Sequence, residues 1–324
     1  MAFEITPQLL ASGHKYRREL LALPVASIDE TIRHMTPRYG IQGKETAGTG
    51  VNGAQLRPYR SEKGATDTSG IETREIETFL GDVVEEFDPH ALWSTIYAST
   101  VGTKPDEWEI ARQMAMLMAM SVGEHLADSI FTAKRNASGS TTMDLFNGFE
   151  TIIETEKTAG KVAEAKGNLI PVGEINLSNV VDTLKRAYRA SHERLRQTAT
   201  KMFLPWDIYD LYCDGYKIET GGTPYNDRYE KTVLEGSDGK CELVPMGGMS
   251  HSRILISPKS NMLVGLDQTG TRETVEIRRA DNPKVVQFFM ASYFGVEYQS
   301  IDPRLLNVVE YTQNAPAPES EPGV

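Results

Sequence analysis

One long helix is the sequence feature that most constrains this fold. From Thr103 to Asn136 the chain contains no proline after Pro105. Thr103 and Asp106 are spaced to satisfy the first unpaired amides, and Pro105 falls in the first turn, where a missing N–H costs nothing. The segment is predicted to run as a helix for about 30 residues, or roughly 45 Å at 1.5 Å per residue.

The middle of this helix, from Met114 to Met120, is apolar on every side. Charged residues lie toward its two ends, at Glu107, Glu109, Arg112, Glu124, Asp128 and Lys134. The apolar run is shorter than the about 18 residues of a membrane span, so protein must cover it all round. We interpret the methionines as core residues, because unbranched Met fills irregular gaps.

The composition places the chain among soluble proteins with a substantial core. It has 324 residues, 40% of them hydrophobic, which is enough for one large domain or two modest ones. The formal charge of −11 argues against a main role in holding nucleic acid, which requires clustered Lys and Arg. We expect cytoplasmic synthesis from the lack of a secretion-signal pattern, and two buried free thiols at Cys213 and Cys241.

The region before the long helix contains little that packs. Residues Arg38 to Gly70 are rich in Gly, Thr and charge, and so long a coreless stretch is unusual inside a compact domain. It is predicted to be either disordered or a projecting loop or hairpin that a neighbour orders. The short helical pieces Gln8 to Ala22 and Ser27 to Met35 could not bury enough surface alone, which indicates an arm resting on another surface.

Residues 138 to 270 are predicted to form a mixed α/β unit. Apolar periodicity and turn residues place its elements as follows. Helices are expected at Leu145 to Glu156, Ser178 to Ala199 and Asp207 to Tyr216, and strands at Met202 to Leu204, Cys241 to Met246, Arg253 to Ser257 and Met262 to Leu266.

The last structured part is predicted to be a β-hairpin lying on the long helix. Thr274 to Arg279 alternates in polarity, a turn follows at Asn282-Pro283, and Val285 to Tyr298 carries aromatics on both faces. This return makes residues 71 to 136 and 271 to 311 one discontinuous domain.

No residue pattern indicates catalysis or ligand binding. Gly48 to Gly53 matches GxGxxG, but no apolar strand precedes it and no helix follows it. Ser250-His251-Ser252 has no visible acid partner and is typical of turn chemistry. The histidines are scattered rather than grouped as metal ligands, at His14, His34, His90, His125, His192 and His251.

A basic helix face follows Ser178, formed by Lys185, Arg186, Arg189, Arg194, Arg196 and Lys201. No aromatic residues alternate with these cations, so a solvated helix face explains them better than a nucleic-acid site. We therefore assign no catalytic, cofactor-binding or metal-binding residue and expect no cofactor. By elimination, the sequence disfavours an enzyme.

Segments between residues 143 and 302 resemble the major capsid proteins of tailed bacteriophages, which have the Hong Kong 97 fold. The similar segments include MDLFNGFETIIETEKTAGKVAEAKGNLIPVGEI, TKMFLPWDIYDLYCDGY and VEIRRADNPKVVQFFMASYFGVEYQSID. The resemblance implies an α+β fold with a long spine helix. It implies an N-terminal arm at 1–37, an extended β loop at 38–75, a peripheral domain at 76–137 and 271–311, an axial domain at 138–270 and a disordered tail at 312–324.

The same resemblance implies a structural major capsid protein that self-assembles into the icosahedral shell around a phage DNA genome. The expected partners are copies of itself in hexamers and pentamers, a separate scaffold protein, a portal, decoration proteins, and packaged double-stranded DNA bound without sequence specificity. The expected location is the virion, after assembly in the bacterial host cytoplasm, with no membrane partner.

Two other functions stay open at this point. An encapsulin-like compartment shell shares the fold but encloses cargo enzymes, and a nucleotide-binding enzyme would use Gly48 to Gly53. One branch of the capsid family also crosslinks a loop Lys to an Asn. Lys44 and Lys63 lie in the matching region, but no Asn or Glu partner is identified, so no crosslinking residue is assigned.

Overall fold

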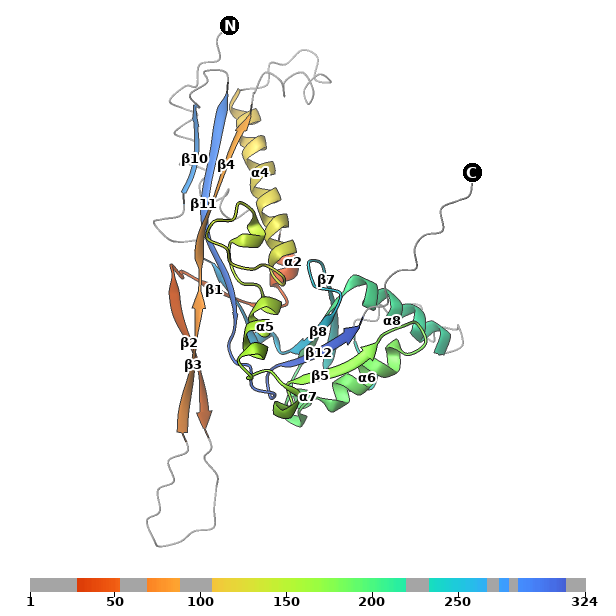
Figure 1. Ribbon diagram of the computed structural model, residues 1–324. Helices are drawn as coiled ribbons and strands as arrows, with labels where there is room; N and C mark the ends of the chain where they lie inside the picture. The colour runs from red at the N-terminus through yellow and green to blue at the C-terminus, as the bar shows by residue number, and fades with distance from the viewer. Residues whose placement is uncertain are drawn as a thin grey trace, which may run out of the picture. The chain divides into compact units, whose positions relative to one another are not determined.

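The computed structural model describes residues 28–52, 69–87, 107–219, 233–266, 274–279 and 285–312 (Figure 1). These residues divide into two compact units. Unit 1 takes its residues from 1–44, 77–149 and 264–296, and unit 2 takes them from 45–76, 150–263 and 297–324. The helical piece expected at Gln8 to Ala22, the residue Lys63 and the tail after Thr312 lie outside the described residues.

Unit 1 is built on a five-stranded sheet. Its strands run in the order β1-β9-β11-β10, with β4 also paired to β11. Their bounds are β1 Thr36–Tyr39, β4 Phe79–Phe87, β9 Met262–Leu266, β10 Thr274–Arg279 and β11 Val286–Tyr298. β10 and β11 are antiparallel, which confirms the predicted closing hairpin.

The long helix α4 spans Glu107–Ser129. Its expected start at Thr103 lies outside the described residues, and its expected end at Asn136 is wrong. After Ser129 the chain turns and pairs with a returning segment: Lys134 N donates to Met143 O, and Gly148 N donates to Ala133 O, both over 2.8 Å. Gly148 is required at this crossing because a Cβ there would overlap the backbone of Phe131.

The expectation that α4 is covered all round is also wrong for the isolated chain. Ala119 is fully buried, whereas its neighbours Leu117 and Met120 are 55% and 42% exposed. Met118 is half-buried. An apolar run on every side of a helix shows that cover is needed, but the covering surface need not belong to the same chain.

The segment that follows α4 packs on the sheet of unit 1. The rings of Phe146 and Phe294 lie 4.9 Å apart, and the guanidinium of Arg135 lies 4.4 Å from the centre of the Phe79 ring. Leu145 lies over Gly81, where a Cβ would come within 2.9 Å of its side chain. Aromatic and cation–π contacts of this kind fix the end of the helix to β4 and β11.

Unit 2 contains a second five-stranded sheet, in the order β5-β12-β8-β6-β7. β12 is parallel to β5 and antiparallel to β8, β8 is antiparallel to β6, and β6 is parallel to β7. The bounds are β5 Leu169–Glu174, β6 Thr200–Pro205, β7 Cys241–Met246, β8 Arg253–Ser257 and β12 Asn307–Thr312.

β12 corrects the expected division of the chain. Residues up to 311 were expected to belong with the closing hairpin, but Val308 and Val309 are fully buried between β5 and β8. The apolar pair fills the centre of the second sheet, which explains why the chain returns to unit 2. The predicted strands Cys241–Met246, Arg253–Ser257 and Met262–Leu266 are confirmed.

The helices of unit 2 are α5 Phe149–Thr158, α6 Val180–Ala190, α7 Glu193–Gln197 and α8 Trp206–Glu219. The single helix expected at Ser178 to Ala199 is wrong. The chain leaves the helical conformation at Ser191, and the Nδ1 atom of His192 then accepts a hydrogen bond from Arg194 N over 3.1 Å. A side-chain acceptor at this place starts a new helix.

Short elements complete the description. These are the helix α2 Asp29–Ile32 and the 3₁₀ turns η1 Thr142–Asp144, η2 Glu164–Lys166 and η3 Lys259–Asn261. β2 Lys44–Asn52 and β3 Ser69–Glu77 form a separate two-stranded sheet, which we call the hairpin. Its two strands favour the ordered alternative over disorder for these residues.

Candidate assembly surfaces

Few of the hairpin side chains that the structure describes are buried. Among its described side chains, Ala47 and Ile76 are buried, and both lie at its base. Lys44 and Glu77 form an ion pair of 3.5 Å, but both side chains are largely exposed, so the pair adds little stability. An isolated two-stranded hairpin is only marginally stable in water, so other contacts must hold it.

Arg74 supplies such a contact at the base of the hairpin. Its Nη1 and Nη2 atoms donate to Glu156 Oε1 and Glu297 Oε1, each over 2.8 Å, and the three side chains are only 12% to 16% exposed. The guanidinium therefore joins β3 to α5 and to the end of β11. We call these three residues the Arg74 cluster.

The pKa values of the two carboxyls in the Arg74 cluster are shifted in opposite directions. Burial raises the pKa of the Glu297 carboxyl despite the neighbouring Arg74. Burial acts in the same direction on Glu156, but hydrogen bonds from Lys161 and Arg74 outweigh it and lower the pKa of that carboxyl. Burial also opposes the charge on Arg74, but Glu297 and Glu156 outweigh it and raise the pKa of the guanidinium.

A second ionic cluster holds α5 on the sheet of unit 2. Lys157 Nζ contacts Glu310 Oε2 over 2.8 Å, and Arg253 Nε contacts Glu310 Oε1 over 3.2 Å. Arg253 also pairs with Glu154. Burial acts to raise the pKa of Glu310, but hydrogen bonds from Lys157 and Arg253 leave it below the usual value. Helix α5 is therefore fixed to β8 and β12.

The structure gives Ser250-His251-Ser252 acid partners that the sequence did not show. His251 Nδ1 lies 2.9 Å from Asp207 Oδ2. Glu150 accepts hydrogen bonds from the backbone N of Ser250, over 2.9 Å, and from its Oγ. In a hydrolytic triad the serine bonds to the histidine, whereas here Ser250 is bonded to a carboxylate. The arrangement ties a turn to α5 and α8.

Other residues considered from the sequence do not come together. Gly48 and Gly50 lie inside strand β2, which is not the strand–turn–helix of a dinucleotide site, and Gly53 lies outside the described residues. In the part of the chain that the structure describes, no group of three His, Cys, Asp or Glu could hold a metal ion. His192 caps α7 and His251 pairs with Asp207.

The two cysteines are free thiols in different surroundings. Cys241 is fully buried, and burial raises the pKa of its thiol to about 12. Cys213 is half-buried rather than buried as expected. No helix among the described residues has the length and apolarity needed to cross a bilayer.

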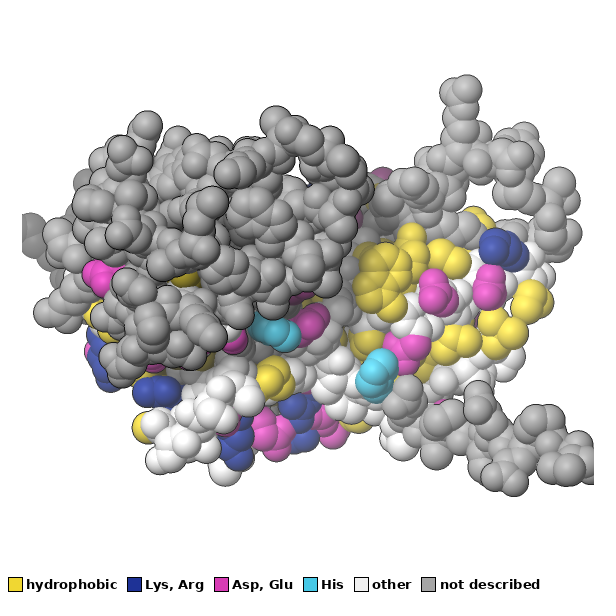
Figure 2. Space-filling model, turned by 90° about the horizontal axis from the view of Figure 1, so that it is seen from above, with side chains coloured by type: hydrophobic (Ala, Val, Ile, Leu, Met, Phe, Trp, Pro, Cys, Tyr) yellow, Lys and Arg dark blue, Asp and Glu magenta, His cyan; other side chains and the backbone are white. Residues whose placement is uncertain are grey.

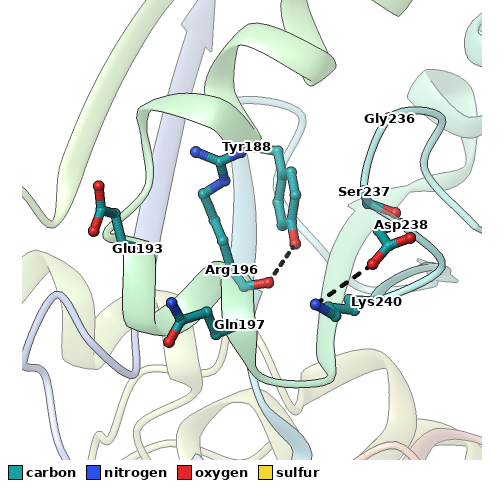
Figure 3. Close-up of a pocket in the computed structure, with 8 residues that line it drawn as sticks. All are labelled: Tyr188, Glu193, Arg196, Gln197, Gly236, Ser237, Asp238 and Lys240. Atoms are coloured by element: carbon teal, nitrogen blue, oxygen red, sulfur yellow. Dashed lines mark hydrogen bonds and ion pairs between the residues drawn. The ribbon is translucent and has the colours of Figure 1, made fainter.

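A pocket of about 320 Å³ lies beside α6 and α7 (Figure 3). Its charged lining residues are two cations, Arg196 and Lys240, and two acids, Glu193 and Asp238. Lys240 Nζ lies 3.6 Å from Asp238 Oδ2, and the Tyr188 hydroxyl donates to the backbone O of Arg196 over 3.3 Å. A lining with equal numbers of cations and acids does not select an anionic or a cationic ligand.

Exposed apolar side chains gather on three elements. They are Leu80 and Val84 on β4, Leu117 and Met120 on α4, and Trp206 and Ile218 on α8, with exposures from 42% to 66%. Figure 2 shows hydrophobic side chains with acidic ones between them on the face that contains α8. Because large exposed apolar patches bind protein partners, we take these three elements as candidate assembly surfaces.

Comparison with known proteins identifies the fold of this chain. No family model and no curated protein matches the sequence. A solved structure of the satellite phage P4 procapsid, which includes a size determination protein, matches with a TM-score of 0.59 and 12% identity. The match covers 97% of this chain and 94% of that chain. The protein shares its fold with phage capsid chains.

Two further structures support the same fold. Gordonia phage Cozz matches with a TM-score of 0.52 and 10% identity, covering 89% of this chain and 87% of that chain. The capsid of Ralstonia phage GP4 has the same TM-score and identity, covering 88% of each chain. The predicted α+β class is therefore confirmed. At these identities the likeness concerns the fold and assigns no role to an individual residue.

Proposed function

We propose that this protein is a structural major capsid protein that self-assembles into the icosahedral head shell around a phage DNA genome. The observation that carries the proposal is the extent of the match with phage capsid chains, which spans nearly the full length of both chains. The hairpin supports it, because a two-stranded element that is marginally stable alone gains order when it lies across a neighbouring subunit.

We further propose that the chain has the subdomains of the Hong Kong 97 fold. The spine helix is α4, the extended loop at 38–75 contains β2 and most of β3, and the arm is 1–37. The peripheral domain is 76–137 and 271–306, and the axial domain is 138–270 together with β12. Moving β12 to the axial domain changes the division expected from sequence, because that strand pairs with β5 and β8.

The proposed partners are copies of the same chain in hexamers and pentamers, a separate scaffold protein, a portal and decoration proteins. Packaged double-stranded DNA would be enclosed without sequence-specific binding, which the net charge of −11 favours because tight binding requires excess Lys and Arg. The proposed location is the virion, after assembly in the host cytoplasm. The proposal includes no catalytic residue, cofactor or metal.

Shortening the hairpin tests this function. Residues 48 to 72 are replaced by two glycines, which keeps Ala47, Arg74 and Ile76 at the base. The removed segment is rich in Gly, Thr and charged residues, so the thermal unfolding curve should stay close to that of the full chain. Shells should be absent by electron microscopy, because the intermolecular contact is lost.

The control is the full chain, produced with the neighbouring head genes and imaged under the same conditions. It should give closed shells that contain DNA. Intact shells from the shortened chain would contradict the intermolecular role of the hairpin. A full chain that stays monomeric under all these conditions would contradict the proposed function itself.

A further inference from the structure

Three exposed arginines form a basic surface on α6 and α7. Arg186 and Arg189 lie on α6, opposite buried side chains such as Leu184, and Arg194 lies on α7. All three arginine side chains are exposed. Because Arg186 and Arg189 are three residues apart in a helix, they share one face of α6. We call Arg186, Arg189 and Arg194 the arginine face.

The arginine face has no acidic partner among the residues that the structure describes. The neighbouring cation, Lys185, is engaged by Glu235 over 3.2 Å. The exposed acids of the same two helices, Asp182 and Glu193, form no ion pair with a described residue. Like charges on one surface repel each other and attract an anion. Guanidinium groups bind carboxylates through paired hydrogen bonds, so the arginine face suits a carboxylate ligand.

The residues that follow Thr312 carry the opposite charge. Residues 313–324, which we call the acidic tail, contain Glu319 and Glu321 and no Lys or Arg. The acidic tail also contains three prolines, which favour an extended backbone and lower the entropy lost on binding. In an extended backbone, residues two apart point to the same side, so both carboxylates can face one surface.

The acidic tail begins beside the start of α6. Thr312 pairs with Glu174, the last residue of β5. The backbone O of Glu174 accepts a hydrogen bond of 2.9 Å from the side chain of Asn179, which immediately precedes α6. Figure 1 shows β12, β5 and α6 next to one another. The described chain therefore brings the first residue of the tail to the helix that carries most of the arginine face.

The arginine face is within reach of the acidic tail. Arg186 and Arg189 lie roughly 10 and 15 Å from Asn179 along the axis of α6, at about 1.5 Å per residue. Glu319 is the seventh residue after Thr312 and can therefore lie up to about 23–25 Å from it. A short tether gives an effective concentration on the order of millimolar, which favours binding within one chain over binding between chains.

We propose that the acidic tail binds the arginine face of its own chain, with Glu319 and Glu321 paired to the guanidinium groups. While the tail is bound, it covers the arginine face and keeps other anions from it. Each ion pair is exposed, so it is weak and is screened by salt, and the tether supplies the remaining stabilisation. The contact lies within one molecule and does not require shell assembly.

Spin labels on the tail and on α7 test the contact. Nitroxides are attached to cysteines introduced by Ser320→Cys and Gln197→Cys in the full chain, which also carries Cys213→Ser. Gln197 is exposed, and Cys241 can stay because it is fully buried. Electron paramagnetic resonance spectra show dipolar broadening only when two nitroxides are close together. An excess of unlabelled chain restricts the signal to label pairs within one molecule.

Charge exchange identifies the groups that make the contact. The arginine variant is R186E with R189E, the tail variant is E319K with E321K, and the exchange variant carries all four changes. Circular dichroism melting curves, which should be unchanged, verify that every variant is folded.

The matched control is K134E with K166E, which makes the same charge change as the arginine variant at two exposed lysines. Neither lysine lies on α6 or α7. Lys166 precedes the start of β5, whereas the acidic tail begins beside the end of that strand. The control should therefore give the same spectrum as the unchanged chain.

The unchanged chain should show dipolar broadening at low salt. The arginine variant and the tail variant should each reduce the broadened fraction by about three-fold or more, because like charges then face each other. The exchange variant should restore the broadening. Raising NaCl from about 0.1 M to about 1 M shortens the Debye length from about 10 Å to about 3 Å and should remove the broadening from the unchanged chain.

Every other result overturns the proposal. Broadening that is absent from the unchanged chain, or that persists in the arginine variant, shows that the tail does not bind the arginine face. Loss in both variants without recovery in the exchange variant overturns the pairing of these charges. A mixture of two singly labelled chains measures contact between molecules, and broadening found only in that mixture would assign the tail to a second copy instead.

Discussion

The sheet of unit 2 and the hairpin are both β-structure, but they are stabilised in different ways. The sheet carries fully buried side chains on its central strands, such as Phe203, Ile254 and Val309. The hairpin is held at its base by Ile76 and by the ionic contacts of Arg74. The sheet is stabilised by its own buried side chains, whereas the hairpin depends on contacts outside its two strands.

Breaking the sheet should have the largest effect. Val309→Asp places a carboxylate between β5 and β8 with no cation to pair it, and should cost about 4 kcal/mol or more of unfolding free energy. Urea unfolding followed by circular dichroism measures this loss. Thr312→Asp, at the exposed end of the same strand, is the matched control and should change stability by less than about 0.5 kcal/mol. Equal effects of both changes would show that β12 is not a central strand.

Removing the cation of the hairpin should have an intermediate effect. Arg74→Ala leaves Glu156 and Glu297 without their shared partner and should cost about 3 kcal/mol at neutral pH. The matched control is Lys44→Ala, which removes an exposed ion pair of the same hairpin and should cost less than about 0.5 kcal/mol.

The loss in Arg74→Ala should also depend on pH. Without the cation, the pKa of Glu297 rises further above its unfolded-state value, so the folded state is penalised at pH above that value. Glu156 loses part of the interaction that lowers its pKa. That interaction stabilises the folded state fully only at pH above the unfolded-state pKa of the carboxyl. Both effects make the loss smaller at about pH 4.5 than at about pH 7.5. A loss that is equal at the two pH values would contradict an ionic role for Arg74.

The smallest effect on folding is expected on the exposed side of α4. Leu117→Glu should change the free energy of unfolding by less than about 0.5 kcal/mol, since this side chain is 55% exposed. Ala119→Glu, two residues away at a fully buried position, is the contrasting variant and should be clearly destabilised. Shell formation by Leu117→Glu, scored by microscopy, then reports whether another copy covers this side. Strong unfolding of Leu117→Glu would mean that the chain encloses the helix itself.

Local patterns in the sequence were sufficient for much of the fold. Alternating polarity and flanking turn residues defined Cys241–Met246, Arg253–Ser257 and the β10–β11 hairpin, because these signals depend on neighbours in the chain. The break between α6 and α7 was missed because His192 is not a common capping residue. The apolar stretch from Met114 to Met120 also could not show whether the chain itself or a second copy covers α4.

The contacts of the candidate surfaces were harder to predict, because they join residues far apart in the sequence. Glu156 and Glu297 meet Arg74 only after the chain has folded, and the same holds for Asp207 with His251. The strand β12 contains a clear apolar pair, but no local pattern indicates that it pairs with β5 and β8. The basic face of α6 was visible in the sequence, whereas the contact between α6 and α8 required the structure.

Gly215 sets how closely α8 approaches α6. A methyl group at this position would lie 2.9 Å from both Leu177 O and Val180 Cγ1, so Gly215→Ala must move α8 away from α6. In a single molecule such a shift is a small local defect. In the proposed shell every copy would carry the same shift in the same direction, so the errors would add around each ring instead of averaging out. In the proposed shell, the missing Cβ of Gly215 would therefore affect the spacing of all the subunits.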